Sequence, residues 1–193
     1  MRLFSTLSLV IAFGLTACGG GAEENGTEAD TTAMDMETET EPAPAGMTTP
    51  AWMSVDETAQ TVTMQISAGS TDANNRWNFN GLYAGVGSIT VPAGYTVTID
   101  FTNADPTQPH SLGIDEAMAS WPATFETVEP AFTGAVTPDA TTTGTAPNGT
   151  ASITFTATDA GEYAMVCYIP GHAIAGMVVP FNVSADGSYG ATQ

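Results

Sequence analysis

A strict alternation of apolar and polar residues constrains the fold of this chain more than any other feature. In the segment Tyr95–Phe101, which reads Tyr-Thr-Val-Thr-Ile-Asp-Phe, every odd-numbered residue is apolar and every even-numbered residue is polar. Successive side chains of a β-strand point to opposite faces, so this period places one face on a core and the other in water. The segment Ile153–Phe155 repeats the pattern. Both segments therefore predict half-buried strands.

Similar short segments recur after Pro50 and are separated by turn residues such as Pro92–Gly94 and Asp159–Gly161. The predicted strands are residues 61–67, 76–80, 88–91, 95–102, 111–114, 152–158, 162–167 and 177–183. No convincing amphipathic helix lies between them. About eight short strands around a single core predict an all-β fold, an antiparallel β-sandwich.

The N-terminal residues 1–18 form a short apolar leader that predicts export. It is too short to span a bilayer as a mature helix and is typical of a secretory signal. Its last residues, Leu15–Cys18, read Leu-Thr-Ala-Cys and resemble the lipobox of bacterial lipoproteins, in which the cysteine carries the lipid. We therefore expect Cys18 to be lipidated and to hold the protein at a membrane, facing the periplasm or the cell exterior. The alternative is an ordinary signal peptide that is cut near Ala17 and releases a soluble protein.

The rest of the chain divides into a linker, one domain and a tail. Residues 19–50 contain no aromatic residue and no apolar periodicity. Such a segment cannot bury enough apolar surface to offset the entropy of ordering, so we expect an acidic flexible linker. We place the folded domain at residues 51–186 and a C-terminal tail at residues 187–193. Within the domain, the long Pro-, Thr- and Ala-rich segment 115–149 is expected to be functional or an insertion, with aromatic residues that cap the domain edge.

Acidic residues dominate the charge of the chain. There are 21 Asp and Glu residues against only Arg2 and Arg76, which gives a formal net charge of −19. A chain of this charge repels nucleic acid, so we exclude nucleic-acid binding. The charge favours solubility, and it also fits long-range attraction to a basic partner.

One loop carries three potential metal ligands at regular spacing. Between two predicted strands the chain presents Cys167-x4-His172-x4-Met177, with Pro170 and two glycines available to bend the backbone. Two soft sulfur atoms and an imidazole favour copper over magnesium, calcium or manganese. If Cys18 is lipidated, Cys167 is also left without a disulfide partner in an oxidising compartment.

The only other histidine of the chain completes the ligand set. His110 follows the alternating strand 95–102. Together with Cys167, His172 and Met177 it provides a trigonal set of two histidines and one cysteine with a weak axial methionine, the ligand set of blue-copper electron-transfer sites. We therefore predict one copper ion per domain, cycling between Cu(I) and Cu(II), and an electron carrier rather than an enzyme.

The residues around these ligands resemble a known family. The loop Pro-Gly-His-Ala-x-x-Gly-Met, preceded by Trp77–Gly81 and Val91–Tyr95, is similar to sulfocyanin and more loosely to rusticyanin, from about residue 55 to residue 183. The resemblance implies a Greek-key β-sandwich of the cupredoxin type with mononuclear type 1 copper. It also implies electron transfer with respiratory partners such as a cytochrome c or a terminal oxidase, and it assigns ligand roles to His110, Cys167, His172 and Met177.

Three further residues are expected near the ligands. Ser111 occupies the position where many cupredoxins have an asparagine that links the two ligand loops by hydrogen bonds. Because Ser111 is a shorter and weaker donor, we expect it to shift the reduction potential upward. Asn80 and Pro170 are the other two residues that we expect beside the metal ligands.

Two other functions use the same sequence features. A copper-delivery or sequestration module would share the ligands but exchange copper readily. An adhesion or scaffold sandwich would hold the same residues by coincidence. Multicopper enzymes need additional histidine clusters, and both histidines are already assigned. We therefore expect an electron carrier instead of an enzyme. We also expect it to be a monomer.

Overall fold

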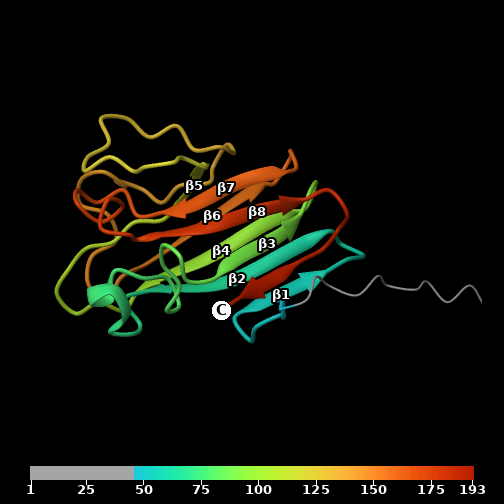
Figure 1. Ribbon diagram of the computed structural model, residues 1–193, viewed down its shortest axis with the longest axis horizontal. Coiled ribbons are helices and arrows are strands. Elements are labelled where there is room, and N and C mark those ends of the chain that lie inside the picture. Colours follow the sequence, from blue (N-terminus) through green and yellow to red (C-terminus); the bar gives the residue numbers. More distant parts are fainter. Residues whose placement is uncertain (1–45) are drawn as a thin grey trace, which may run out of the picture. The chain divides into compact units, whose positions relative to one another are not determined.

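Two β-sheets form the domain (Figure 1). The structure is a computed structural model and describes residues 46–193. In spatial order, the first sheet consists of β1 (Met53–Asp56), β2 (Thr61–Ala68), β4 (Thr96–Asn103) and β6 (Thr150–Thr156). The second sheet consists of β5 (Gly113–Glu116), β7 (Gly161–Val166), β8 (Val178–Ser184), β3 (Ser88–Pro92) and β9 (Gly190–Thr192). One core lies between the sheets, where Phe155 of β6 contacts Phe181 of β8 with ring centroids 6.3 Å apart.

The alternation in β4 produces the burial that it predicts. Val97 and Ile99 are fully buried, Phe101 is 1% exposed, and Asp100 and Thr102 face solvent. Burying each such apolar side chain contributes about 1.5–3 kcal/mol. The all-β sandwich predicted from these patterns is therefore confirmed.

The prediction of a purely antiparallel arrangement is wrong at two strand pairs. β2 pairs with β4 in parallel, and β3 pairs with β8 in parallel. The alternation of side chains is the same in both kinds of pairing, so it does not report strand direction. After β2 the chain crosses to the second sheet, forms β3 there, and returns as β4, which allows β4 to run in the same direction as β2.

The predicted strand at residues 76–80 is also wrong. The structure has a short 3-10 helix η1 (Ala73–Arg76) there, in which Asn74, Asn75 and Arg76 all have positive φ, between 47° and 69°. Asparagine tolerates this left-handed region better than most residues. The side-chain amide of Asn78 stabilises the turn by donating to the carbonyls of Thr71 and Ala73, at 3.0 and 2.7 Å.

The sheets extend beyond the expected domain boundaries. β9 lies within residues 187–193, which were expected to form a tail, and it pairs antiparallel with β3. The backbone of Thr48, within the expected linker, pairs with Ala191. Both short segments are held by pairing with distant parts of the chain. The expected signal sequence, Cys18 and residues 19–45 of the expected linker lie outside the described residues.

The long segment between β5 and β6 packs on the domain by aromatic contacts. Phe132 stacks on Phe155 at 5.4 Å, and Phe125 contacts Tyr168 edge to face at 4.8 Å. Its backbone also bridges to β5 at Gly113. In Figure 1 the segment lies beside the loop that follows β7, and the amide of Gly171 in that loop donates to the carbonyl of Ala123 at 2.7 Å.

The described residues were also searched for membrane-spanning helices. Within residues 46–193 no helix has both the length and the apolar character needed to cross a bilayer.

Candidate metal centre

The four predicted ligands come from two loops at the ends of strands. His110 lies between β4 and β5, whereas Cys167 follows β7 directly, and His172 and Met177 lie in the loop before β8. The backbone N–H of Cys167 donates to the carbonyl of Met177 at 3.2 Å, and the N–H of Met177 donates to the carbonyl of His172 at 2.9 Å. These bonds close the loop and fix the three positions relative to each other.

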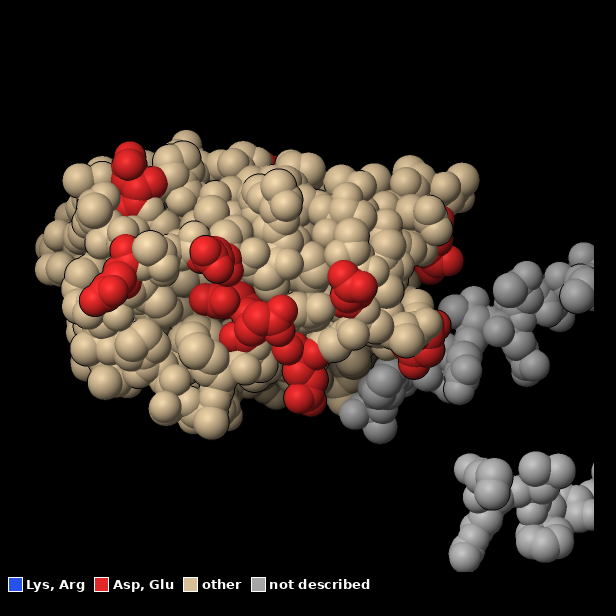
Figure 2. Space-filling model, turned by 90° about the horizontal axis from the view of Figure 1, so that it is seen from above, with Lys and Arg blue, Asp and Glu red and all other residues tan. Residues whose placement is uncertain are grey.

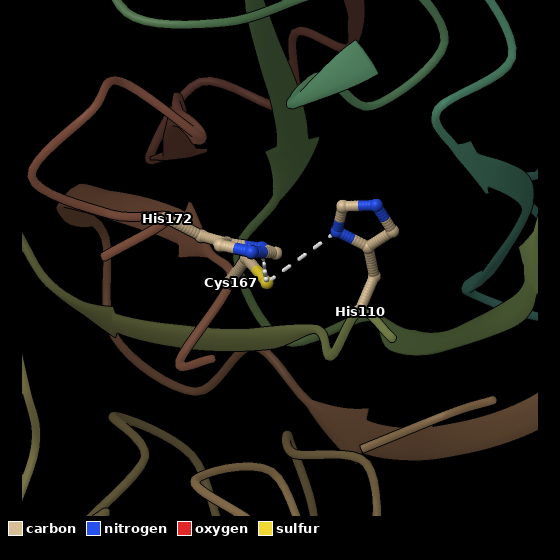
Figure 3. Close-up of side chains that lie close together, drawn as sticks. All are labelled: His110, Cys167 and His172. Carbon is tan, nitrogen blue, oxygen red and sulfur yellow. Dashed lines mark hydrogen bonds between the residues drawn. The ribbon is translucent and has the colours of Figure 1, made fainter. Parts of the chain in front are cut away.

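Three of the ligand side chains converge (Figure 3). The Nδ1 atom of His172 lies 3.4 Å from Sγ of Cys167, and the Nδ1 atom of His110 lies 3.9 Å from the same sulfur. The ligand atoms of the three residues all lie within 4.8 Å of one another, and all three residues are buried. Two imidazole nitrogens and one sulfur around a common point match the trigonal donor set that copper prefers.

Met177 lies in the same buried cluster as Cys167 and is fully buried. With Met177 on the same loop, the donor set fits a single copper ion, as predicted from the sequence. Its role as the axial ligand stays a prediction.

Burial controls the protonation of the ligands. Burial raises the pKa of the Cys167 thiol to about 11, despite hydrogen bonds from Ser111 and Ile169 that lower it. The pKa of His172 is lowered to about 4, first by burial and then by the proximity of His110. Burial likewise lowers the pKa of His110. At neutral pH both imidazoles are therefore in the neutral form that binds metals, while Cys167 must lose a proton to bind.

A model of the sulfocyanin (SoxE) domain matches residues 48–189. The chain belongs to the sulfocyanin family. A sulfocyanin of Sulfolobus acidocaldarius is 32% identical over 122 residues, an alignment that covers 61% of this chain and 61% of that relative. The chain thus matches about three fifths of the length of this relative.

Solved cupredoxin structures are similar in fold. A crystal structure of rusticyanin variants superposes with a TM-score of 0.50 at 21% identity, covering 72% of this chain and 86% of that chain. Auracyanin A from Chloroflexus aurantiacus, described as a blue copper protein, gives a TM-score of 0.46 at 25% identity, over 64% of this chain and 99% of its own. The rusticyanin likeness supports the fold, so the predicted cupredoxin-type β-sandwich is confirmed.

Ser111 links the two ligand loops of the sulfocyanin domain. Its backbone N–H donates to Sγ of Cys167 at 3.4 Å, and its hydroxyl oxygen accepts from the backbone N–H of Tyr168 at 2.9 Å. The hydroxyl lies 3.8 Å from the same sulfur. The structure thus places Ser111 beside the thiol, and its effect on the reduction potential stays a prediction.

The other two residues expected beside the ligands are Asn80 and Pro170. The side chain of Asn80 accepts from the N–H of Ser67 at 2.8 Å and donates to the carbonyl of Gln65 at 2.9 Å, so its hydrogen bonds are to β2. Asn80 therefore fixes the turn that follows η1, and its place beside the ligands stays a prediction. Pro170 is exposed and lies two residues before His172.

Two residues that the sequence analysis did not assign to the site contact its histidines. The ring of Trp77 stacks on His172, with centroids 4.6 Å apart and planes at 21°. A carboxylate oxygen of the buried Asp105 lies 3.4 Å from Nε2 of His110. The available signals were the position of Trp77 in the family motif and the acidic residue five positions before His110, but neither shows a contact by itself.

The left-handed turn of η1 positions Trp77. The side-chain amide of Asn74 donates to the carbonyls of Trp77 and Ala175, at 2.9 and 3.1 Å, and so joins the turn to the ligand loop. Left-handed residues other than glycine cost about 1–2 kcal/mol each. Such strain persists only where surrounding contacts fix it, as the two amide bonds do here.

Proposed function

We propose that this sulfocyanin-family protein is a mononuclear type 1 copper protein that carries single electrons between respiratory partners. The observation that carries the proposal is the convergence of His110, Cys167 and His172, whose ligand atoms lie within 4.8 Å of one another in a buried site. When bound, copper supplies the one-electron couple between Cu(II) and Cu(I). The protein's part is to hold the donor atoms in one arrangement for both states.

Each ligand has a distinct role in this proposal. The thiolate of Cys167 would supply the strongest donor to copper, the imidazoles of His110 and His172 would supply two further donors, and the thioether of Met177 would supply a weak one that tunes the potential. The hydrogen bonds between Cys167 and Met177, and between Ser111 and the Cys167 loop, keep the donors in place. Little has to rearrange when an electron arrives or leaves.

Electrons are proposed to pass through the surface around His172. This histidine is 4% exposed, and its loop carries Ile174, which is 60% exposed, and the exposed Pro170. A small apolar contact suits a partner that must dissociate quickly, because redox encounters of small area are weak. A cytochrome c or a terminal oxidase is the kind of partner that we propose.

The charge of the domain supports attraction to a basic partner. Arg76 is the single Lys or Arg in residues 46–193. Figure 2 shows acidic side chains across one face of the described domain. Attraction between this surface and a basic partner would raise the association rate and weaken as salt is added. We propose a monomer that is exported and held by a lipid on Cys18 at a membrane, facing the periplasm or the cell exterior.

The test is the visible absorption and electron spin resonance of the full-length chain loaded with Cu(II). We expect an intense thiolate-to-copper band in the wild type and its loss in Cys167→Ser. A copper-loaded wild type without visible absorption would overturn the proposal.

Delivery or sequestration of copper is the alternative function. It requires ready exchange of the metal, which is disfavoured by the full burial of His110 and Cys167. Rapid loss of Cu(I) to a mild chelator, together with no electron exchange with a cytochrome c, would favour the alternative.

A further inference from the structure

Asp105 is a buried carboxylate that is not one of the four predicted metal ligands. It lies two residues beyond β4 and is 2% exposed. The side chain of Asn103 accepts from its backbone N–H at 3.0 Å. Gly69 packs directly against it, because a Cβ atom at that position would lie 2.9 Å from the Cβ of Asp105. The carboxylate therefore has a fixed position inside the domain.

The two oxygens of this carboxylate have different partners. Oδ1 accepts from the backbone N–H of Thr107 at 2.8 Å, from its hydroxyl at 2.9 Å, and from the backbone N–H of Gln108 at 3.1 Å. Oδ2 is directed at the ring of His110, 3.4 Å from Nε2. One oxygen thus anchors the carboxylate to the turn, and the other faces a metal ligand.

The charge of Asp105 has no Lys or Arg partner within the described residues. Arg76 is the single such residue in 46–193, and it pairs with Asp72 at 2.9 Å. Burial by itself raises the pKa of Asp105, but hydrogen bonds from Thr107 and Gln108 outweigh it and lower the pKa to about 2. A buried anion is stabilised by hydrogen bonds such as these and by any positive charge nearby, including that of a metal ion. The group it faces is the His110 ring, whose opposite nitrogen points at Cys167.

This contact selects one form of the His110 ring. A carboxylate accepts hydrogen bonds, so it favours the tautomer with the proton on Nε2 and leaves the lone pair on Nδ1, the atom that faces Cys167. The distance of 3.4 Å is long for a hydrogen bond. The negative charge therefore contributes more than the hydrogen bond itself.

We propose that Asp105 is a positioning residue of the metal centre, which fixes the Nε2-protonated form of His110 and stabilises the higher oxidation state of the bound copper. This inference rests on the proposed function. Cu(II) carries one more positive charge than Cu(I), so a fixed negative charge behind a ligand favours Cu(II) and lowers the reduction potential. Removal of that charge should raise the potential.

The test is the variant Asp105→Asn in the full-length chain, because Asn keeps an oxygen for the turn and removes the charge. We expect the ratio of Cu(I) affinity to Cu(II) affinity to rise at least tenfold, and a tenfold rise corresponds to an increase in reduction potential of about 59 mV.

The matched control is Asp115→Asn. Asp115 is a half-buried carboxylate that accepts a hydrogen bond at 3.4 Å from the hydroxyl of Tyr168, the residue that follows Cys167 in the sequence. We expect a smaller shift there. Equal shifts in both variants, or no shift in Asp105→Asn, would overturn the proposal.

A second measurement needs neither copper nor a variant at position 105. In the metal-free wild type at neutral pH, nitrogen NMR of the His110 ring should show the proton on Nε2, with the His172→Ala variant used for assignment. A proton on Nδ1 would refute the role of Asp105 even if the copper-loaded protein is blue. A colourless copper-loaded wild type with the expected tautomer would instead refute the electron-carrier function and leave the positioning of His110 standing.

Discussion

The two histidine ligands are held in different ways. His110 is fully buried, its backbone pairs with Thr145 of the long β5–β6 segment, and its ring faces the Asp105 carboxylate. His172 is 4% exposed, and its ring stacks on Trp77 within a loop that also carries the exposed Ile174. Polar and charged groups fix the inner histidine, whereas an aromatic ring fixes the outer one.

In the proposed electron carrier, this difference separates two tasks. A fixed charge behind the inner ligand changes the relative stability of the two copper states. An aromatic ring beside the outer ligand holds it in position without adding a charge, and the adjoining surface stays apolar for a transient partner. The inner histidine is therefore expected to set the potential and the outer one to transmit the electron.

Replacing each histidine by glycine should give the largest effect. Both His110→Gly and His172→Gly should lose the blue band, because each removes one of three strong donors. Added imidazole should restore the band in His172→Gly at a concentration at least tenfold lower than in His110→Gly, since His110 is fully buried and its ring faces Asp105, whereas the loop of His172 reaches the surface. Titration of visible absorption measures this ratio. Equal imidazole requirements would remove the distinction between inner and outer sites.

Copper binding should release about one proton at pH 7, and this proton should come from Cys167. The pKa of Cys167 is about 11 and that of His172 is about 4. The thiol is therefore protonated and the imidazole neutral, so apparent affinity should rise about tenfold per pH unit from pH 7 to pH 10. Calorimetry in two buffers of different ionisation enthalpy counts the protons. Cys167→Ser is the control and should release none, whereas release of two protons from the wild type would mean that a histidine is also charged.

Removing the aromatic stack should affect the outer histidine alone. Trp77→Leu is expected to lower the free energy of unfolding by about 1–3 kcal/mol, because a stacked pair and partly buried apolar area are lost. Electron self-exchange, measured by NMR line broadening, should slow. The reduction potential should move less than in Asp105→Asn. Trp77→Phe, which keeps an aromatic ring, should recover most of the loss, and a larger potential shift in Trp77→Leu than in Asp105→Asn would contradict the separation of tasks.

The smallest structural effect is expected at the apolar surface. Ile174 is 60% exposed, so Ile174→Ser should change the free energy of unfolding by no more than about 0.5 kcal/mol. Its visible spectrum should match the wild type, because the ligands are untouched. Stopped-flow electron transfer with a cytochrome c should nevertheless slow severalfold. Met118→Ser, at the other large exposed apolar residue of the described domain, is the control, and equal slowing there would argue against a port at His172.

Local patterns predicted the strands because alternation is a property of consecutive residues. Seven of the eight predicted strands correspond to β2–β8. The failure at 76–80 has a local cause that the pattern did not reveal, namely three successive left-handed residues stabilised by asparagine side chains. Strands β1 and β9, of four and three residues, were not among the predicted strands.

The sequence by itself determined the chemical identity of the site, because both histidines, one cysteine and one methionine stand at spacings that suit copper. It also determined that the ligands follow strands of an all-β domain. Only the tertiary structure decided that Asp105 faces His110 and that Trp77 stacks on His172. The same holds for the parallel pairing of β2 with β4. These contacts depend on loop paths and on pairing between distant strands, and no local periodicity encodes them.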